Sequence, residues 1–300
     1  MNQKISLTWD HGLGDTANFC RMLPLYFHRG YEIEVACEPS KEFLFRAAGA
    51  RIIPKDQARA HHGWPYPDSE THWGHGQEWR GNKSGCNLSR PPLPDIGSRE
   101  ELWPAYCSVD LSEKVRAAIT PEAWARVDKS LDGLPRPIVL LHTIGNTGQS
   151  AKSLPKDDHL PLYRSLLDRI DGTILLLDWD WRMPRMKHYR LRPAAQQFNG
   201  LPTEDLMALL LRSQLLIGVD SGPLHAAGMT DILALGIFRP GHYPSTYLLP
   251  RRRTLAMVEG QRHWNRHKRL SYRIVERAQT PDNIADLAAQ LLQPCKYLPN

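Results

Sequence analysis

Two short segments carry residue types suited to bond-making on a phosphorylated ligand. The first is HGLGDT at residues 11–16, in which Asp15 ends a glycine turn. The second is DSGPLHAA at residues 220–227, which follows the apolar run LLIGV, and Pro223 suits a first helical turn, where its missing N–H costs nothing. Phosphates bind at helix N-termini beyond the carboxyl ends of parallel strands, so we expect this turn to hold one. An ordinary strand-to-helix turn is the alternative interpretation.

The elements that must position these segments alternate between strand and helix. In the first half, the pattern predicts strands at residues 5–9, 32–37 and 51–53 and helices at 16–29 and 41–48. A helix over 111–129 follows, and then strands at 138–142, 173–178, 215–219 and 232–238 with helices at 160–170, 203–211 and 281–293. This order is typical of parallel sheets covered by helices, so the predicted fold class is α/β.

The length and composition favour two domains. The chain has 300 residues, of which 41% are apolar, and this is enough for two packed cores. The segment LDGLPRP at 131–137 has the turn chemistry of a linker. We therefore predict an N-terminal domain over residues 1–134 and a C-terminal domain over residues 135–300, with a cleft between them.

The expected compartment follows from apolar runs and cysteines. No apolar run is long enough to span a bilayer, and the first residues are too polar for a signal peptide. The five cysteines are scattered and form no Cys-x-x-Cys pair. This pattern argues against a disulfide framework and a structural zinc site, and it favours the reducing cytoplasm.

Positive charge is concentrated in one segment. The net charge is +6, and residues 239–277 contain ten Lys and Arg but only two acidic residues. Such a segment fits an anionic partner: an acidic glycan, lipid phosphates at a membrane surface, or DNA. A solvated basic face that keeps the protein soluble is the alternative.

Four motifs in the same order resemble the ADP-heptose:lipopolysaccharide heptosyltransferase family. They are HGLGDT at 11–16, KSLP at 152–155, NGLPTEDL at 199–206 and DSGPLHAA at 220–227. The resemblance covers most of the chain apart from residues 58–104 and the basic segment. It implies the GT-B architecture, in which two Rossmann-like domains face each other across a cleft: an acceptor-binding domain over residues 1–134 and a nucleotide-sugar-binding domain over residues 135–300. It also implies an inverting glycosyl transfer that needs no metal.

The resemblance implies that Asp15 is the general base. A carboxylate beside the cleft would accept the proton of the acceptor hydroxyl as the new C–O bond forms. The alternative interpretation is that Asp15 caps the helix at 16–29, because aspartate is common at that position.

The resemblance also implies a set of residues that bind the nucleotide sugar. Lys152 would supply a positive charge to the phosphates, Thr143, Asn146 and Thr147 would act as neutral donors, and Glu204 is a candidate for the ribose. The full predicted set is Gly14, Thr143, Asn146, Thr147, Lys152, Glu204, Asp220, Ser221, Gly222, Pro223, Leu224 and His225. The alternatives are a solvated lysine at 152, an ordinary first-turn acid at 204 and a partly buried histidine at 225.

A tryptophan- and histidine-rich region departs from the family pattern. Between residues 61 and 104 the alternation of strands and helices is lost, and a loop of that length is usually functional or mobile. We interpret it as the acceptor-binding part, with Trp64, Trp73 or Trp79 stacking on a sugar or a base. Packing anchors are the alternative. Its histidines lack carboxylates or cysteines at ligand spacing, so no metal site is predicted.

The resulting hypothesis is a transferase without a cofactor. Its donor would be a nucleotide-diphosphate sugar, ADP-heptose-like by resemblance, and its acceptor a hydroxyl on a saccharide or lipid-linked glycan, with peripheral membrane contact. One alternative keeps the chemistry but uses a nucleic-acid base hydroxyl or a protein as acceptor. A second is a non-catalytic nucleotide-sugar-binding module, or an epimerase or hydrolase of the same fold.

Overall fold

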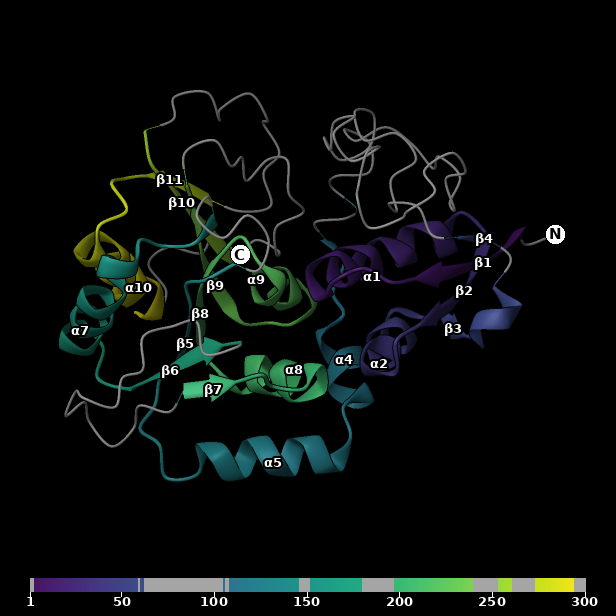
Figure 1. Cartoon of the computed structure of the whole chain (residues 1–300), viewed down its shortest axis with the longest axis horizontal. Coiled ribbons are helices and arrows are strands. Elements are labelled where there is room, and N and C mark those ends of the chain that lie inside the picture. Colours follow the sequence, from purple (N-terminus) through teal and green to yellow (C-terminus); the bar gives the residue numbers. More distant parts are fainter. Residues whose placement is uncertain are drawn as a thin grey trace.

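The computed structural model of the chain describes residues 3–58, 60–61, 105, 108–145, 152–179, 197–239, 253–260 and 273–293. Within these ranges the protein contains two parallel sheets, one from each half of the sequence (Figure 1). Several residues of the predicted sites lie outside the described residues: Trp64, Trp73, Trp79, Asn146 and Thr147. Most of the basic segment lies outside them as well.

The first sheet is small and is packed on one face by two helices. Its strands are β1 (Gln3–Trp9), β2 (Tyr31–Cys37), β3 (Arg51–Ile52) and β4 (Ala60–His61), in the order β3-β2-β1-β4. The helices α1 (Leu13–His28) and α2 (Pro39–Ala48) connect the first three strands, and the 3₁₀ turn η1 (Lys55–Gln57) follows β3. Trp9 stacks on Phe19 of α1 at 4.4 Å and meets Phe45 of α2 edge-on, so these rings join the sheet to its helices.

The second sheet has seven described strands, all parallel to their neighbours. They are β5 (Ile138–His142), β6 (Thr173–Asp178), β7 (Gln197–Asn199), β8 (Leu215–Val219), β9 (Leu233–Phe238), β10 (Thr254–Val258) and β11 (Arg273–Glu276). Their order is β11-β10-β9-β8-β5-β6-β7. The chain therefore leaves β5 toward β6 and later returns to its other side at β8, which makes the β5–β8 pair the point where the strand order reverses.

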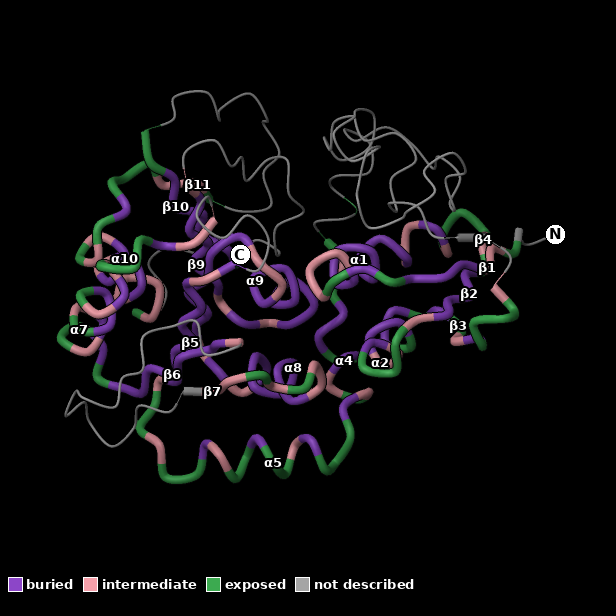
Figure 2. Tube along the Cα trace, viewed as in Figure 1, coloured by how far each residue is buried: buried purple, intermediate pink, exposed green. Residues whose placement is uncertain are grey.

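Helices cover both faces of this second sheet. Leu140 packs in a cluster with α8 (Thr203–Arg212), whereas Leu141 packs with α7 (His159–Arg169) and α10 (Pro281–Leu292). The strands β5, β6 and β8 are buried along their whole length (Figure 2), because a doubly covered parallel sheet leaves no polar face. The remaining short elements are α9 (Gly222–Ala226) and the 3₁₀ turns η3 (Lys156–Asp158) and η5 (Ala227–Met229).

The predicted helix at 111–129 is two helices, α4 (Ser112–Ala118) and α5 (Pro121–Leu131). The break has a local cause, since the residue before a proline is disfavoured in the helical conformation. Thr120 is instead extended and caps α5 by accepting a hydrogen bond from Ala123 N. Helix α5 precedes the expected domain boundary at 134 and 135, yet it packs on α8 of the second half.

The two halves share apolar contacts. One cluster of buried side chains includes Leu7 and Phe19 of the first half together with Leu216 and Ala226 of the second. Helix α1 lies against α9 and η5, so the N-terminus of α1 is brought to the carboxyl end of β8 (Figure 1). None of the described helices is long and apolar enough to cross a bilayer.

Candidate active site

Asp15 lies inside the first turn of α1. The helix begins at Leu13 with Gly12 as its N-cap residue, three residues earlier than the sequence pattern predicts. Thr16 fixes this start, because both its backbone N–H and its hydroxyl donate to the carbonyl of Gly12, at 3.0 and 2.9 Å. The alternative interpretation of Asp15 as the helix cap is therefore wrong: the chain is already helical at that position.

The turn after β8 has the predicted strand–turn–helix form. Ser221 is the N-cap of α9, and Pro223 lies in its first turn. The first intrahelical bond of α9 runs from His225 N to the carbonyl of Ser221 at 3.3 Å. The N–H groups of Gly222 and Leu224 precede that bond, so they have no acceptor within the helix and are geometrically able to receive an oxyanion.

Two glycines allow these turns to meet. A Cβ placed on Gly14 would lie 3.1 Å from Cδ2 of His225 and 3.4 Å from the Cα of Gly222. A Cβ on Gly222 would in turn lie 3.4 Å from the Cβ of Leu13. The predicted residues Gly14, Gly222 and His225 are thus adjacent, although more than 200 positions separate Gly14 from the other two along the chain.

Asp220 is a buried carboxylate that contacts both His225 and Lys152. Its side chain is 3% exposed, with Oδ1 3.0 Å from Nε2 of His225 and Oδ2 2.7 Å from Nζ of Lys152. Burial alone would raise the pKa of Asp220, but the hydrogen bond and charge of His225 and the charge of Lys152 lower it to about 2. Asp220 is therefore a carboxylate at any physiological pH.

Asp15 has the opposite electrostatic behaviour. Burial raises its pKa from 3.8 to about 6, and the Asp220 carboxylate acts in the same direction. Interactions with His225, Lys152 and Lys41 oppose this rise in the pKa of Asp15. A carboxylate with a pKa near 6 is ionised at neutral pH and is still basic enough to take a proton from a reacting hydroxyl.

The loop that carries Lys152 is held by a buried histidine. Leu154 N donates to the carbonyl of Thr143 at 3.0 Å, and Gly145 N donates to the hydroxyl of Ser153 at 3.1 Å. His159 connects the two ends of the loop: its Nδ1 lies 3.1 Å from the Thr143 hydroxyl, and its Nε2 lies 3.2 Å from the carbonyl of Leu154. A carbonyl only accepts, so Nε2 carries the proton and the hydroxyl donates to Nδ1.

The predicted role of Thr143 as a neutral donor to the phosphates stays a prediction. Thr143 is fully buried, and its hydroxyl is engaged with His159. Burial also lowers the pKa of His159, which keeps the ring neutral and this bond intact. Sequence reasoning missed His159, because its partners lie 5 and 16 residues away and only the folded loop brings them together.

Glu204 lies in the first turn of α8, as the alternative interpretation of this residue expects. Its carboxylate accepts a hydrogen bond of 2.5 Å from Thr120 N, which ties α8 to the start of α5. Its partner is therefore a backbone group of the first half, and the expected contact with a ribose stays a prediction.

The strand order explains why the other residues gather. Thr143 follows β5 and Asp220 follows β8, the two strands between which the order of the second sheet reverses. Ligands of open α/β sheets bind beyond the carboxyl ends of strands at such a switch point. His142 and Trp179 lie at the same edge, with their rings in edge contact at 5.2 Å.

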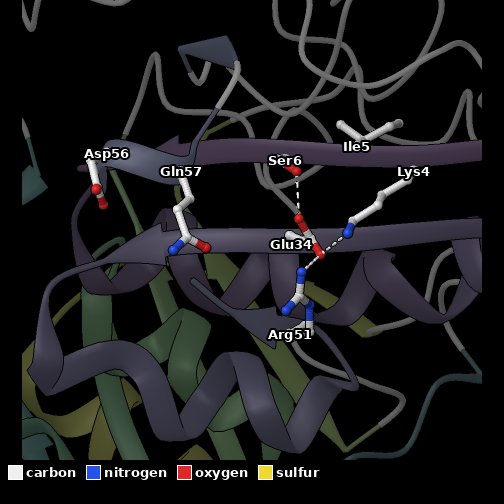
Figure 3. A pocket seen from close by; sticks show the side chains of 7 residues that line it. All are labelled: Lys4, Ile5, Ser6, Glu34, Arg51, Asp56 and Gln57. Carbon is white, nitrogen blue, oxygen red and sulfur yellow. Dashed lines mark hydrogen bonds and ion pairs between the residues drawn. The ribbon is translucent and has the colours of Figure 1, made fainter. Parts of the chain in front are cut away.

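A separate polar pocket lies on the first sheet (Figure 3). It has a volume of about 650 Å³, and the carboxylate of Glu34, which is 6% exposed, points toward Ser6, Lys4 and Arg51. Ser6 donates to Glu34 at 2.6 Å, Lys4 pairs with it at 2.5 Å, and Arg51 also donates to it. The residues that line this pocket include neither Asp15 nor Asp220, and Lys4 and Arg51 neutralise the charge of Glu34.

The described ranges contain no group of three or more His, Cys, Asp and Glu side chains that would hold a metal ion.

Three solved glycosyltransferase structures have a similar fold. A glycosyl transferase of family 9 from Veillonella parvula matches with a TM-score of 0.60 and 13% identity over 97% of each chain. The E. coli heptosyltransferase WaaC with ADP matches with a TM-score of 0.55 and 11% identity, over 96% of this chain and 100% of that one. The fold is GT-B.

A further GT-B structure, E. coli ADP-heptose lipopolysaccharide heptosyltransferase II, matches with a TM-score of 0.54 and 12% identity over 96% of this chain and 99% of that chain. The predicted fold class is thereby confirmed. No protein-family model matches the chain, and no curated protein matches it in sequence.

Proposed function

We propose that this protein is an inverting, metal-independent glycosyltransferase that moves a sugar from a nucleotide diphosphate to an acceptor hydroxyl. One observation carries the proposal: Asp15 interacts electrostatically with Asp220, His225 and Lys152, which pair with one another at the strand switch point of a GT-B fold. This arrangement joins a proton acceptor to a cationic cradle, which are the two requirements of glycosyl transfer.

Asp15 acts as the general base in the proposed reaction. The acceptor oxygen forms a bond to the anomeric carbon while the bond from that carbon to the diphosphate oxygen breaks. Asp15 takes the hydroxyl proton, and the nucleoside diphosphate leaves with the electron pair. Attack from the face opposite the leaving group inverts the anomeric configuration.

The departing diphosphate needs stabilisation, and we assign it to the turn after β8. The N–H groups of Gly222 and Leu224 are without an intrahelical acceptor, and Lys152, whose side chain is 20% exposed, pairs with Asp220 at the start of the same turn. Preorganised donors of this kind stabilise the charge that develops in a transition state. Lys152 is held by Asp220 in the structure, and we propose that it contacts the phosphates when the donor is bound.

The donor class is inferred from the fold neighbours. One of them was solved with ADP, and another is named for ADP-heptose. We therefore propose a nucleotide-diphosphate sugar, ADP-heptose-like, as donor. For the acceptor we propose a saccharide or lipid-linked glycan with anionic groups, reached through peripheral membrane contact of the basic segment. The scattered cysteines support a cytoplasmic reaction.

A thermal-shift screen tests the donor first. The protein is heated with ADP-, UDP-, GDP- and CMP-sugars, and a ligand of the folded state raises the melting temperature. We expect a response to one nucleotide class, and ADP-heptose is the first compound to try. The absence of any response would count against the transferase proposal.

The variant Asp15→Asn then separates binding from chemistry. We expect it to keep donor affinity and to lose transfer, because an amide does not accept the proton. Asp132→Asn, an exposed residue at the end of α5, is the matched control and should keep full transfer. Transfer that survives Asp15→Asn would show that another group is the base.

A further inference from the structure

Lys41 is a buried lysine in the first turn of α2. Its side chain is 9% exposed, and the helix that contains it begins at Pro39. A buried ammonium group is costly unless it is paired. Its position also opposes the helix dipole, because cations are unfavourable near a helix N-terminus. The stability of α2 therefore does not explain a lysine at this position.

The ammonium group connects α2 to the turn after β1. Its Nζ donates to the carbonyl of His11 at 2.7 Å and lies 2.8 Å from the carboxylate of Glu38. His11 is the first residue of the HGLGDT motif, and it precedes the N-cap Gly12 by one position.

The same turn is held from its other side by α1. Thr16 donates to the carbonyl of Gly12 and accepts a 2.9 Å hydrogen bond from the indole of Trp9. The His11 ring packs edge-on against that indole, with 4.6 Å between ring centroids. The two consecutive carbonyls that lead into α1 are thus each fixed by a side chain, one of them from α2.

We propose that Lys41 is a positioning residue for Asp15: its ammonium group holds the carbonyl of His11 and thereby fixes the turn from which α1 and Asp15 begin. The proposal rests on the proposed role of Asp15 as the base. Four charged or titratable groups act on Asp15, namely His225, Lys152 and Asp220 from the second half and Lys41 from the first.

Two nuclear magnetic resonance signals of the full-length protein test this proposal without any substrate. The indole N–H of Trp9, assigned with Trp9→Phe, reports the geometry of the turn. The carboxyl carbon of Asp15, assigned with Asp15→Asn, reports its titration. In Lys41→Met we expect the Trp9 signal to shift and the titration midpoint of Asp15 to rise, because a nearby cation that lowers this pKa is removed. Lys41→Arg, which keeps a cationic donor, should restore the midpoint.

Arg46→Met is the matched control on the same helix. Arg46 is exposed and pairs with Glu42 at 2.7 Å on the surface, so both signals should stay unchanged. If both signals also stayed unchanged in Lys41→Met, the proposal would be overturned, and this conclusion does not depend on which reaction the enzyme catalyses. Lys41→Gln serves as a second neutral variant. If both neutral variants failed to fold, Lys41 would be assigned to the stability of the first half and the proposal would fall.

Loss of transfer is a separate outcome. If Asp15→Asn kept transfer while Lys41→Met moved both signals, the role of Asp15 as base would be wrong but the positioning of the turn by Lys41 would stand.

Discussion

Two aspartates of one site are driven to opposite protonation behaviour by their surroundings. Asp220 is buried with two partners that favour its charged form, and its pKa falls to about 2. Burial dominates at Asp15, and its pKa rises to about 6. Pairs of carboxyl groups whose pKa values are pushed apart identify which group exchanges protons in catalysis. This contrast supports the proposal that Asp15 exchanges the proton, whereas Asp220 remains anionic and holds Lys152 and His225.

The rate of transfer should depend on pH through Asp15. Only the carboxylate accepts a proton, so we expect kcat/KM to rise with pH through about 6 and then to level off. Asp15→Asn should lower kcat by about 10²- to 10⁴-fold. A pH series with the donor found in the screen measures this, and a flat profile between pH 5 and 7 would contradict the assignment.

The same pKa makes a prediction about stability. The folded state raises the pKa of Asp15 above its ordinary 3.8, so the protonated form stabilises the fold. That contribution is fully present below about pH 3.8 and is lost as pH rises through about 6. Asp15→Asn should therefore raise the unfolding free energy at pH 8 by up to about 3 kcal/mol and change it little at pH 4. Urea unfolding at both pH values checks the sign, and destabilisation at pH 8 would contradict it.

A glycine is needed at position 14 because His225 and Gly222 pack closely against it, and not because its backbone takes an unusual φ angle. The Cβ of Gly14→Ala would lie 3.1 Å from the ring of His225, which Asp220 holds in place. We expect at least about a tenfold loss of transfer with a lower melting temperature, since a packed neighbour has to move. Gly12→Ala is the control, because the space around Gly12 is open among the described residues. Equal behaviour of the two variants would argue against this contact.

At the scale of elements, α5 is fastened to α8 by two forked ion pairs. Arg126 donates to both oxygens of Asp205 at 2.9 and 2.6 Å, and Arg212 donates to both oxygens of Asp128 at 2.7 and 2.8 Å. Arg212 also lies 4.5 Å from the centre of the Trp124 ring. These contacts attach a helix that precedes the linker to the second half.

Arg126→Met should weaken this attachment more than its exposed position suggests. Its partner Asp205 is 7% exposed, so the substitution leaves a nearly buried carboxylate without this arginine. We expect a lower melting temperature by differential scanning fluorimetry. Arg46→Met, which breaks an exposed pair on α2, should leave the temperature unchanged. Equal effects would show that the α5–α8 pair is an ordinary surface contact.

At the scale of the whole molecule, the two halves are joined by a common apolar cluster that includes Phe19 of α1 and Leu216 of β8. Separating them would expose this cluster to water, which is unfavourable in proportion to the apolar area. The site is assembled at the same junction, from the start of α1 and the end of β8. Integrity of the site and association of the halves are thus linked.

We therefore expect a single cooperative unfolding transition. Scanning calorimetry should give one peak, and a donor sugar should move that whole peak upward, because it binds only the assembled form. Two well-separated peaks, of which the donor moved only one, would show that the halves unfold independently.

The sequence by itself determined the local parts of this protein. The apolar run before Asp220, the glycine and proline of the following turn and the alternation of strands and helices depend on neighbours within a few residues. From these, the two turns of the site and the α/β class could be predicted. The early start of α1 and the break before Pro121 could not be placed to the residue, because capping contacts decide such boundaries.

Only the tertiary structure decided which residues share a site and in what charge state. The strand order puts Thr143 and Asp220 side by side, and no local pattern encodes that order. Burial raised the pKa of Asp15, and packing placed the Thr143 hydroxyl against His159 and the Lys41 ammonium group against the carbonyl of His11. Solvation and charge pairing depend on the whole surroundings of a group, and those surroundings exist only once distant segments have packed together.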